Sequence, residues 1–174
     1  QADLVIAEVG AWYNLLSKEP EQARMAFEKC VTGLARADRL GARCCVNIAG
    51  SCGKVWDGPH PDNLTDETFD RIVEITRGII DHVKPSRTVF ALEPMPWSLP
   101  DSPECYLALL RAIDRPQQFG VHLDPINMIT SPRRYYASGA FVKHCFELLG
   151  PHVVSCHTKD LLLTRPLTVT MQEV

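Results

Sequence analysis

Three short apolar runs in this sequence each end in a side chain that can bind a metal ion. The runs at 88–93, 119–124 and 153–157 end at Glu93, Asp124 and His157, and about one strand-plus-helix unit separates each of these residues from the next. Parallel strands alternating with helices bring their carboxyl ends to one face of a β/α barrel. We therefore predict that the three side chains lie in one site at that face.

The rest of the chain alternates in the same way. Strands are predicted at 3–10, 43–48, 88–93, 119–124 and 153–157. Helices are predicted from about 20 to 40, from a cap at 65 or 66 to just before 85, from a cap at 101 or 102 to about 113, and from about 138 to 149, with a turn of helix within 131–136. Strands that are apolar almost throughout are typical of a parallel sheet covered by helices. The predicted fold class is α/β, a (β/α)8 TIM barrel represented by about five βα units.

Five units do not close an eight-stranded barrel, and an open set would expose strand edges. We therefore expect residues 1–174 to be a single partial TIM-barrel domain, truncated at both ends, within a longer protein.

Composition excludes several other classes of function. A net charge of −3 gives no broad basic surface for nucleic acid, and no apolar run is long enough to cross a membrane. The seven cysteines include no CxxC pair, which favours a reduced, cytoplasmic setting. Glycine-rich phosphate loops and a GxSxG nucleophile motif are missing from the sequence.

Strand periodicity sharpens the prediction of a site, since residues two apart point to the same face. His122 therefore shares a face with Asp124, and Lys159 with His157. Each residue alone has a structural explanation, because a carboxylate after a strand is common turn chemistry and a lone histidine is usually a core residue. His122 could contact substrate, orient Asp124 or simply pack, and Lys159 could bind substrate oxygens or pair with Asp160.

The motifs Ala-Leu-Glu93-Pro, His122-Leu-Asp124-Pro-Ile-Asn127 and Ser155-Cys-His157-Thr-Lys159-Asp160 resemble the sugar phosphate isomerase/epimerase family of the xylose-isomerase-like TIM-barrel superfamily. The resemblance spans nearly the whole chain, with the five strands corresponding to the third to seventh of eight. It implies one divalent metal ion (Mn, Co, Mg or Zn) held by Glu93, Asp124, His157 and a second glutamate from the eighth strand. Glu173 follows His157 too soon to be that glutamate, so we expect the fragment itself to be inactive.

The resemblance also implies a carbohydrate substrate and isomerisation or epimerisation through an enediolate stabilised by the metal. Glu93 and Lys159 are the predicted catalytic residues. The predicted substrate contacts are His122, Asn127, Asn47 and Trp97. A keto-polyol dehydratase and an inactive metal-binding scaffold remain alternatives, and a homo-oligomer is possible for the full-length protein. The related endonuclease-IV-like DNA-repair branch is disfavoured, because it expects histidines where this chain has Asn47 and Asn127.

Overall fold

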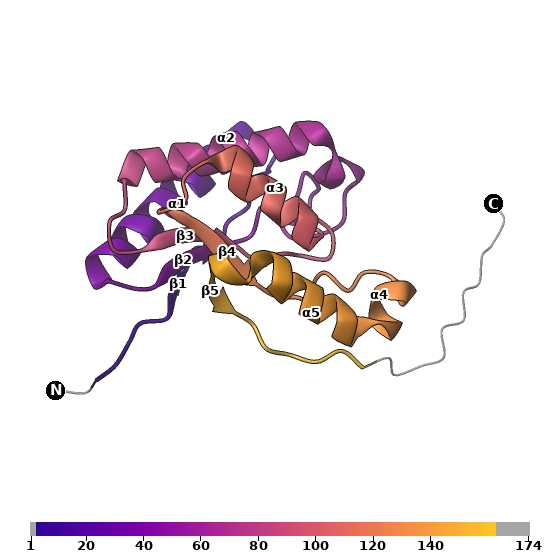
Figure 1. The fold of residues 1–174 in the computed structure, drawn as a ribbon. Coiled ribbons are helices and arrows are strands. Elements are labelled where there is room, and N and C mark those ends of the chain that lie inside the picture. Colours follow the sequence, from indigo (N-terminus) through magenta and orange to yellow (C-terminus); the bar gives the residue numbers. More distant parts are fainter. Residues whose placement is uncertain (1–2, 163–174) are drawn as a thin grey trace.

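Five parallel strands form one sheet in the computed structural model of the chain, which describes residues 3–162. The strands are β1 (Glu8–Gly10), β2 (Cys44–Asn47), β3 (Val89–Leu92), β4 (Phe119–Leu123) and β5 (Val153–Cys156), and they lie side by side in chain order. The helices are α1 (Pro20–Leu40), α2 (Asp66–Val83), α3 (Pro103–Ile113), α4 (Pro132–Tyr136) and α5 (Ser138–Leu149), with short 3-10 turns at Pro61–Leu64 and Gly150–His152. The helices gather on one side of the sheet (Figure 1). This arrangement confirms the predicted α/β fold.

The sheet is strongly curled. Glu8 on β1 lies 3.4 Å from His122 on β4, and Cys44 on β2 lies 3.3 Å from Ser155 on β5. Strands three apart in a flat sheet are separated by about 14 Å, because adjacent strands are about 4.8 Å apart. These side chains can meet only if the sheet bends toward its own inner face, as half of a barrel does.

Side chains alternate between the two faces of each strand as the sequence predicts. On β3, Phe90 and Leu92 are buried in the main core beneath the helices, whereas Ala91 belongs to a small inner cluster with Cys44 and Val46. Small residues on the inner face leave room for the polar side chains that follow at the strand ends. The outer face of the sheet therefore packs against the helices, whereas the inner face carries the polar side chains of the site.

Local signals in the sequence account for the helix boundaries. Pro20 occupies the first turn of α1, and Gly41 ends that helix in the left-handed conformation with φ 68°. The Thr65 side chain caps α2 by accepting a hydrogen bond from the Thr68 backbone N–H, and Ser102 caps α3 in the same way. No helix within residues 3–162 is both long enough and apolar enough to span a bilayer.

The first strand is shorter than predicted. Residues 3–7 read as apolar strand sequence, but Leu4 and Val5 are exposed and β1 begins only at Glu8. Strand pairing sets this limit, since β2 begins at Cys44, the partner of Glu8. Glu173, considered above as a possible ligand, lies outside the described residues.

A buried tyrosine on α3 ties two strands together. The Tyr106 hydroxyl lies 2.5 Å from the Leu92 carbonyl oxygen and 3.1 Å from that of Gly120, and it accepts a hydrogen bond from the Leu92 N–H. Tyr106→Phe leaves these buried groups short of a partner, so we expect a loss of about 1–3 kcal/mol in the free energy of unfolding. Urea denaturation measures it, with Tyr136→Phe at an exposed position as the control. Equal stability of the two variants would show that the hydroxyl does not hold the strands.

Candidate functional site

Two buried carboxylates lie side by side at the C-terminal ends of β3 and β4. Glu93 is 6% exposed and Asp124 is fully buried. Burial raises the pKa of Glu93, the nearby His157 opposes that shift, and the neighbouring Asp124 carboxylate reinforces it. Two carboxylates in one buried place repel each other, so the site favours a positive charge between or beside them.

His157, immediately after β5, contacts both carboxylates. Its Nδ1 lies 3.0 Å from Glu93 Oε1 and 3.6 Å from Asp124 Oδ2. The His157 backbone N–H donates to the Leu123 carbonyl, which continues the pairing with β4 and fixes this position. The structure therefore brings Glu93, Asp124 and His157 together, as their positions at strand ends predict.

His122 completes the cluster from the inner face of β4. Its ring is fully buried and meets the His157 ring edge-on, with centroids 4.6 Å apart. Nδ1 lies 2.7 Å from the Ser155 hydroxyl and 3.4 Å from Glu8 Oε2. Nε2 has no hydrogen-bond partner among the described residues and lies 3.9 Å from Glu93 Oε2. Burial lowers the pKa of His122, which favours the neutral ring.

Lys159 and Asn127 link the carboxylates on the open side. The Lys159 ammonium lies 2.6 Å from Asp124 Oδ2 as an ion pair, although that oxygen accepts no well-aligned hydrogen bond. Lys159 also donates to Asn127 Oδ1 at 2.8 Å. Asn127 Nδ2 donates to Glu93 Oε1 and to the Pro94 carbonyl. Asn127 thus holds both Glu93 and Lys159 in place.

The residues fit a metal ion. Glu93, His122 and His157 each offer a ligand atom, and these atoms lie within 4.8 Å of one another. Two ligands of one zinc ion lie at most about 4.4 Å apart, because each bond is about 2.0–2.2 Å. Small side-chain shifts would therefore suffice. The third member of this group is His122, whereas the sequence predicted Asp124 as the third ligand.

Of the other two predicted substrate contacts, Asn47 lies away from the cluster and Trp97 stays a prediction. The Asn47 side chain bonds to the backbone N–H and carbonyl of Tyr13 and to Cys30 on α1, so its position on the helix side of the sheet corrects the prediction. Asn47 lies two residues after Cys45, which faces the helices, and residues two apart on a strand point to the same face. Trp97 is 54% exposed and lines a cavity of about 310 Å³ with Ile129 and other loop residues.

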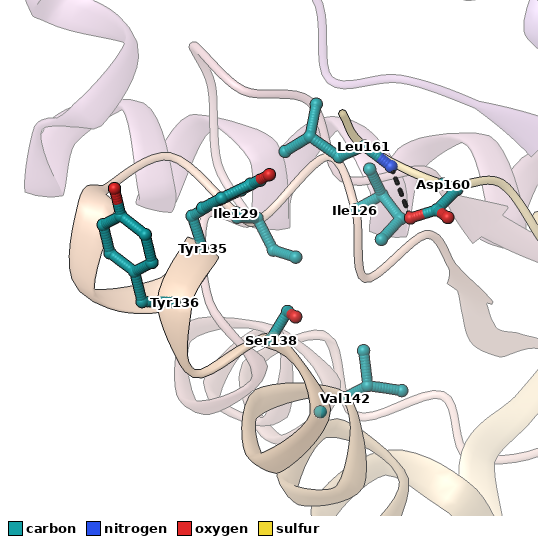
Figure 2. A pocket seen from close by; sticks show the side chains of 9 residues that line it. Ile126, Ile129, Tyr135, Tyr136, Ser138, Val142, Asp160 and Leu161 are labelled. Carbon is teal, nitrogen blue, oxygen red and sulfur yellow. Dashed lines mark hydrogen bonds between the residues drawn. The ribbon is translucent and has the colours of Figure 1, made fainter. Parts of the chain in front are cut away.

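A larger cavity of about 500 Å³ lies between the segment after β5 and helices α4 and α5. Figure 2 shows Ile126, Ile129 and Leu161 around it, with Asp160 accepting a hydrogen bond from the Leu161 N–H at 2.7 Å. Ile126 follows Asp124 by two residues, and Asp160 directly follows Lys159. The cavity therefore adjoins the cluster, and most of its lining is apolar or aromatic.

Sequence reasoning missed the role of Glu8. The residue is a charge inside an otherwise apolar run, and this charge is the one signal in the sequence that could have singled it out. Its place on the inner face follows from its pairing with Cys44, which belongs to the inner cluster. Its contact with His122 depends on the curl of the sheet, which no local pattern describes.

Comparison with known proteins identifies the family of this chain and, separately, solved structures with the same fold. The model of a family described as "Xylose isomerase-like TIM barrel" matches residues 2–165. No curated protein sequence matches at a significant level.

Several solved structures share the fold. A probable 3-DHS dehydratase from Bacillus anthracis is 20% identical, with a TM-score of 0.70, over 97% of this chain and 55% of its own. A D-allulose 3-epimerase from Methylomonas sp. is 16% identical, with a TM-score of 0.64, over 83% and 47%. A Mycobacterium smegmatis barrel protein in complex with magnesium is 14% identical, with a TM-score of 0.65, over 90% and 51%. The chain spans about half the length of these structures.

Proposed function

The chain belongs to the xylose isomerase-like TIM barrel family, and we propose that it carries the metal site of an isomerase or epimerase. The substrate class is a sugar, a sugar phosphate or a related polyol. One observation carries the proposal: side chains at three successive strand ends converge, with His157 Nδ1 3.0 Å from Glu93 Oε1 and 3.6 Å from Asp124 Oδ2. The epimerase among the structural neighbours supports the reaction class.

Glu93, Asp124 and His157 would hold the ion. When bound, a divalent ion supplies Lewis-acid polarisation of the substrate's carbonyl and adjacent hydroxyl oxygens, which acidifies the neighbouring C–H. Asp124 is suited to a fixed role, because its Oδ1 accepts the Asn127 backbone N–H and its Oδ2 faces Lys159. His157 is half-exposed, which leaves the site open to substrate.

Glu93 would move the proton. Its carboxylate takes the proton from the carbon next to the carbonyl and, in an isomerisation, returns it to the neighbouring carbon on the same face. Epimerisation requires a second acid on the opposite face, which is the role of the glutamate expected from the eighth strand. Burial raises the pKa of Glu93, which brings this base closer to the acidity that proton transfer near neutral pH requires. The hydrogen bond from Asn127 fixes the direction of the carboxylate.

Lys159 would stabilise the negative charge that develops on the substrate oxygen. Its ammonium already stands 2.6 Å from Asp124 and is partly exposed toward the open side. A preformed cation at that place needs little reorganisation during the reaction. The adjoining cavity of about 500 Å³ would take the part of the substrate beyond the reacting carbons.

A dehydratase is the second candidate. The Bacillus anthracis dehydratase supports it, because its fold matches 97% of this chain. The opening step is the same removal of a proton next to a carbonyl, after which a β-hydroxyl leaves as water instead of the proton returning.

Turnover in D2O separates the candidates. We test the metal-loaded complete protein with a panel of ketoses, ketose phosphates and β-hydroxy ketones. An isomerase or epimerase incorporates deuterium at the exchanged carbon of a product with the substrate's skeleton. A dehydratase forms an enone with its ultraviolet absorbance. Metal-loaded protein that catalyses neither change would favour the inactive scaffold and contradict the proposal.

A further inference from the structure

We propose that His122 is a direct metal ligand through Nε2, and that Glu8 and Ser155 are positioning residues that hold its ring for this purpose. The inference rests on the proposed metal site and changes its ligand set. It gives His122 a different role from the substrate contact that the sequence indicated.

The first support is an unpartnered nitrogen. His122 is 0% exposed, and its Nε2 has no hydrogen-bond partner among residues 3–162. Buried polar atoms are nearly always paired, so each exception needs an explanation. Nε2 faces Glu93 Oε2 at 3.9 Å, too far for a hydrogen bond but a suitable separation for two ligands of one ion.

The second support is the tautomer that the surroundings select. A carboxylate only accepts hydrogen bonds, and Glu8 Oε2 lies 3.4 Å from His122 Nδ1. The Ser155 hydroxyl, 2.7 Å from Nδ1, itself receives the Cys44 thiol. These neighbours favour the proton on Nδ1, which leaves the lone pair on Nε2, the nitrogen that lies 3.9 Å from Glu93 Oε2. Metal-binding histidines are usually oriented by such a carboxylate on the other ring nitrogen.

A purely structural histidine accounts less well for this geometry. Edge-on packing against His157 fills space, but it leaves the Nε2 lone pair facing the Glu93 carboxylate without a cation or proton between them. A bound ion would remove that repulsion and use both groups. His157 would be a further ligand, because its ligand atom belongs to the same group.

Two imidazoles also change the expected metal. Imidazole suits zinc and other late transition metals, whereas magnesium prefers carboxylate, carbonyl and water oxygens. The site should therefore bind Zn²⁺ or Co²⁺ in preference to Mg²⁺.

Zinc is a suitable diamagnetic probe for the test. In the complete protein we measure the ring 15N signals of the histidines by NMR before and after one equivalent of Zn²⁺. We expect His122 to carry its proton on Nδ1 throughout, and Zn²⁺ to shift His122 Nε2 together with the His157 ring. The His122→Gln variant assigns the signal and should lower zinc affinity more than about 100-fold, because loss of only an outer partner of a ligand costs about 10–100-fold. Glu8→Gln should lower zinc affinity about 10–100-fold and weaken the preference for the Nδ1 proton.

The exposed Glu147→Gln variant on α5 is the matched control and should change neither quantity. A zinc-induced shift confined to His157 would overturn the inference while leaving the proposed metal site intact. Absence of any zinc-dependent shift would overturn both. A His122 ring that carries its proton on Nε2 would also contradict the inference. This observation is made on the wild-type protein, so it does not depend on whether a variant folds.

Discussion

Replacing Glu93 with glutamine should lower turnover roughly 10²–10⁴-fold while the protein still binds its metal ion. Glutamine keeps the size of the side chain and one oxygen able to coordinate, and other ligands remain. It cannot take up and return a proton from carbon. The measurement pairs metal content with solvent-deuterium exchange at the substrate's acidic carbon in the complete protein.

Glu74→Gln is the control for Glu93→Gln, because Glu74 is exposed on α2, away from the site. It should leave both quantities at the wild-type level. If Glu93→Gln with metal bound still exchanges the proton at nearly the wild-type rate, Glu93 is only a ligand and the acid–base role is wrong.

His157→Ala should behave differently, because metal binding and activity should be lost together. Its Nδ1 contacts both Glu93 and Asp124, and alanine offers no donor atom in its place. Loss of even an outer partner of a ligand costs about 10–100-fold in metal affinity, so loss of the ligand itself should cost more than about 100-fold. Isothermal titration with Co²⁺ measures the affinity, and activity at saturating Co²⁺ shows whether excess metal restores turnover.

His82→Ala, at an exposed position in the last turn of α2, is the matched control. It should bind Co²⁺ as the wild type does. A His157→Ala variant that binds Co²⁺ with unchanged affinity would show that the ion, if bound, is held without this imidazole.

Much of this fold could be predicted from the sequence because its signals are local. The boundaries of α1 follow from Pro20 and Gly41, and the start of α3 follows from Ser102 and its following proline. The convergence of Glu93, Asp124 and His157 follows from one rule of topology, that parallel strands end on the same side. No single residue of the three was informative alone.

The rest depends on tertiary geometry. The curl of the sheet brings Glu8 to His122 across two intervening strands, and a period-two pattern says nothing about curvature. The length of β1 depends on where β2 begins, so an apolar run was predicted as strand before Glu8. Asn47 was placed in the site because it ends a strand, although its parity directs it toward α1.

The central claim is that these strand ends hold one divalent ion, and anomalous diffraction tests it most directly. Crystals of the complete protein grown with Co²⁺ are measured above and below the cobalt absorption edge. We expect one strong anomalous peak within bonding distance of Glu93, Asp124 and His157. The claim would be contradicted if no peak appeared at that place and Glu93 and His157 remained hydrogen-bonded to each other.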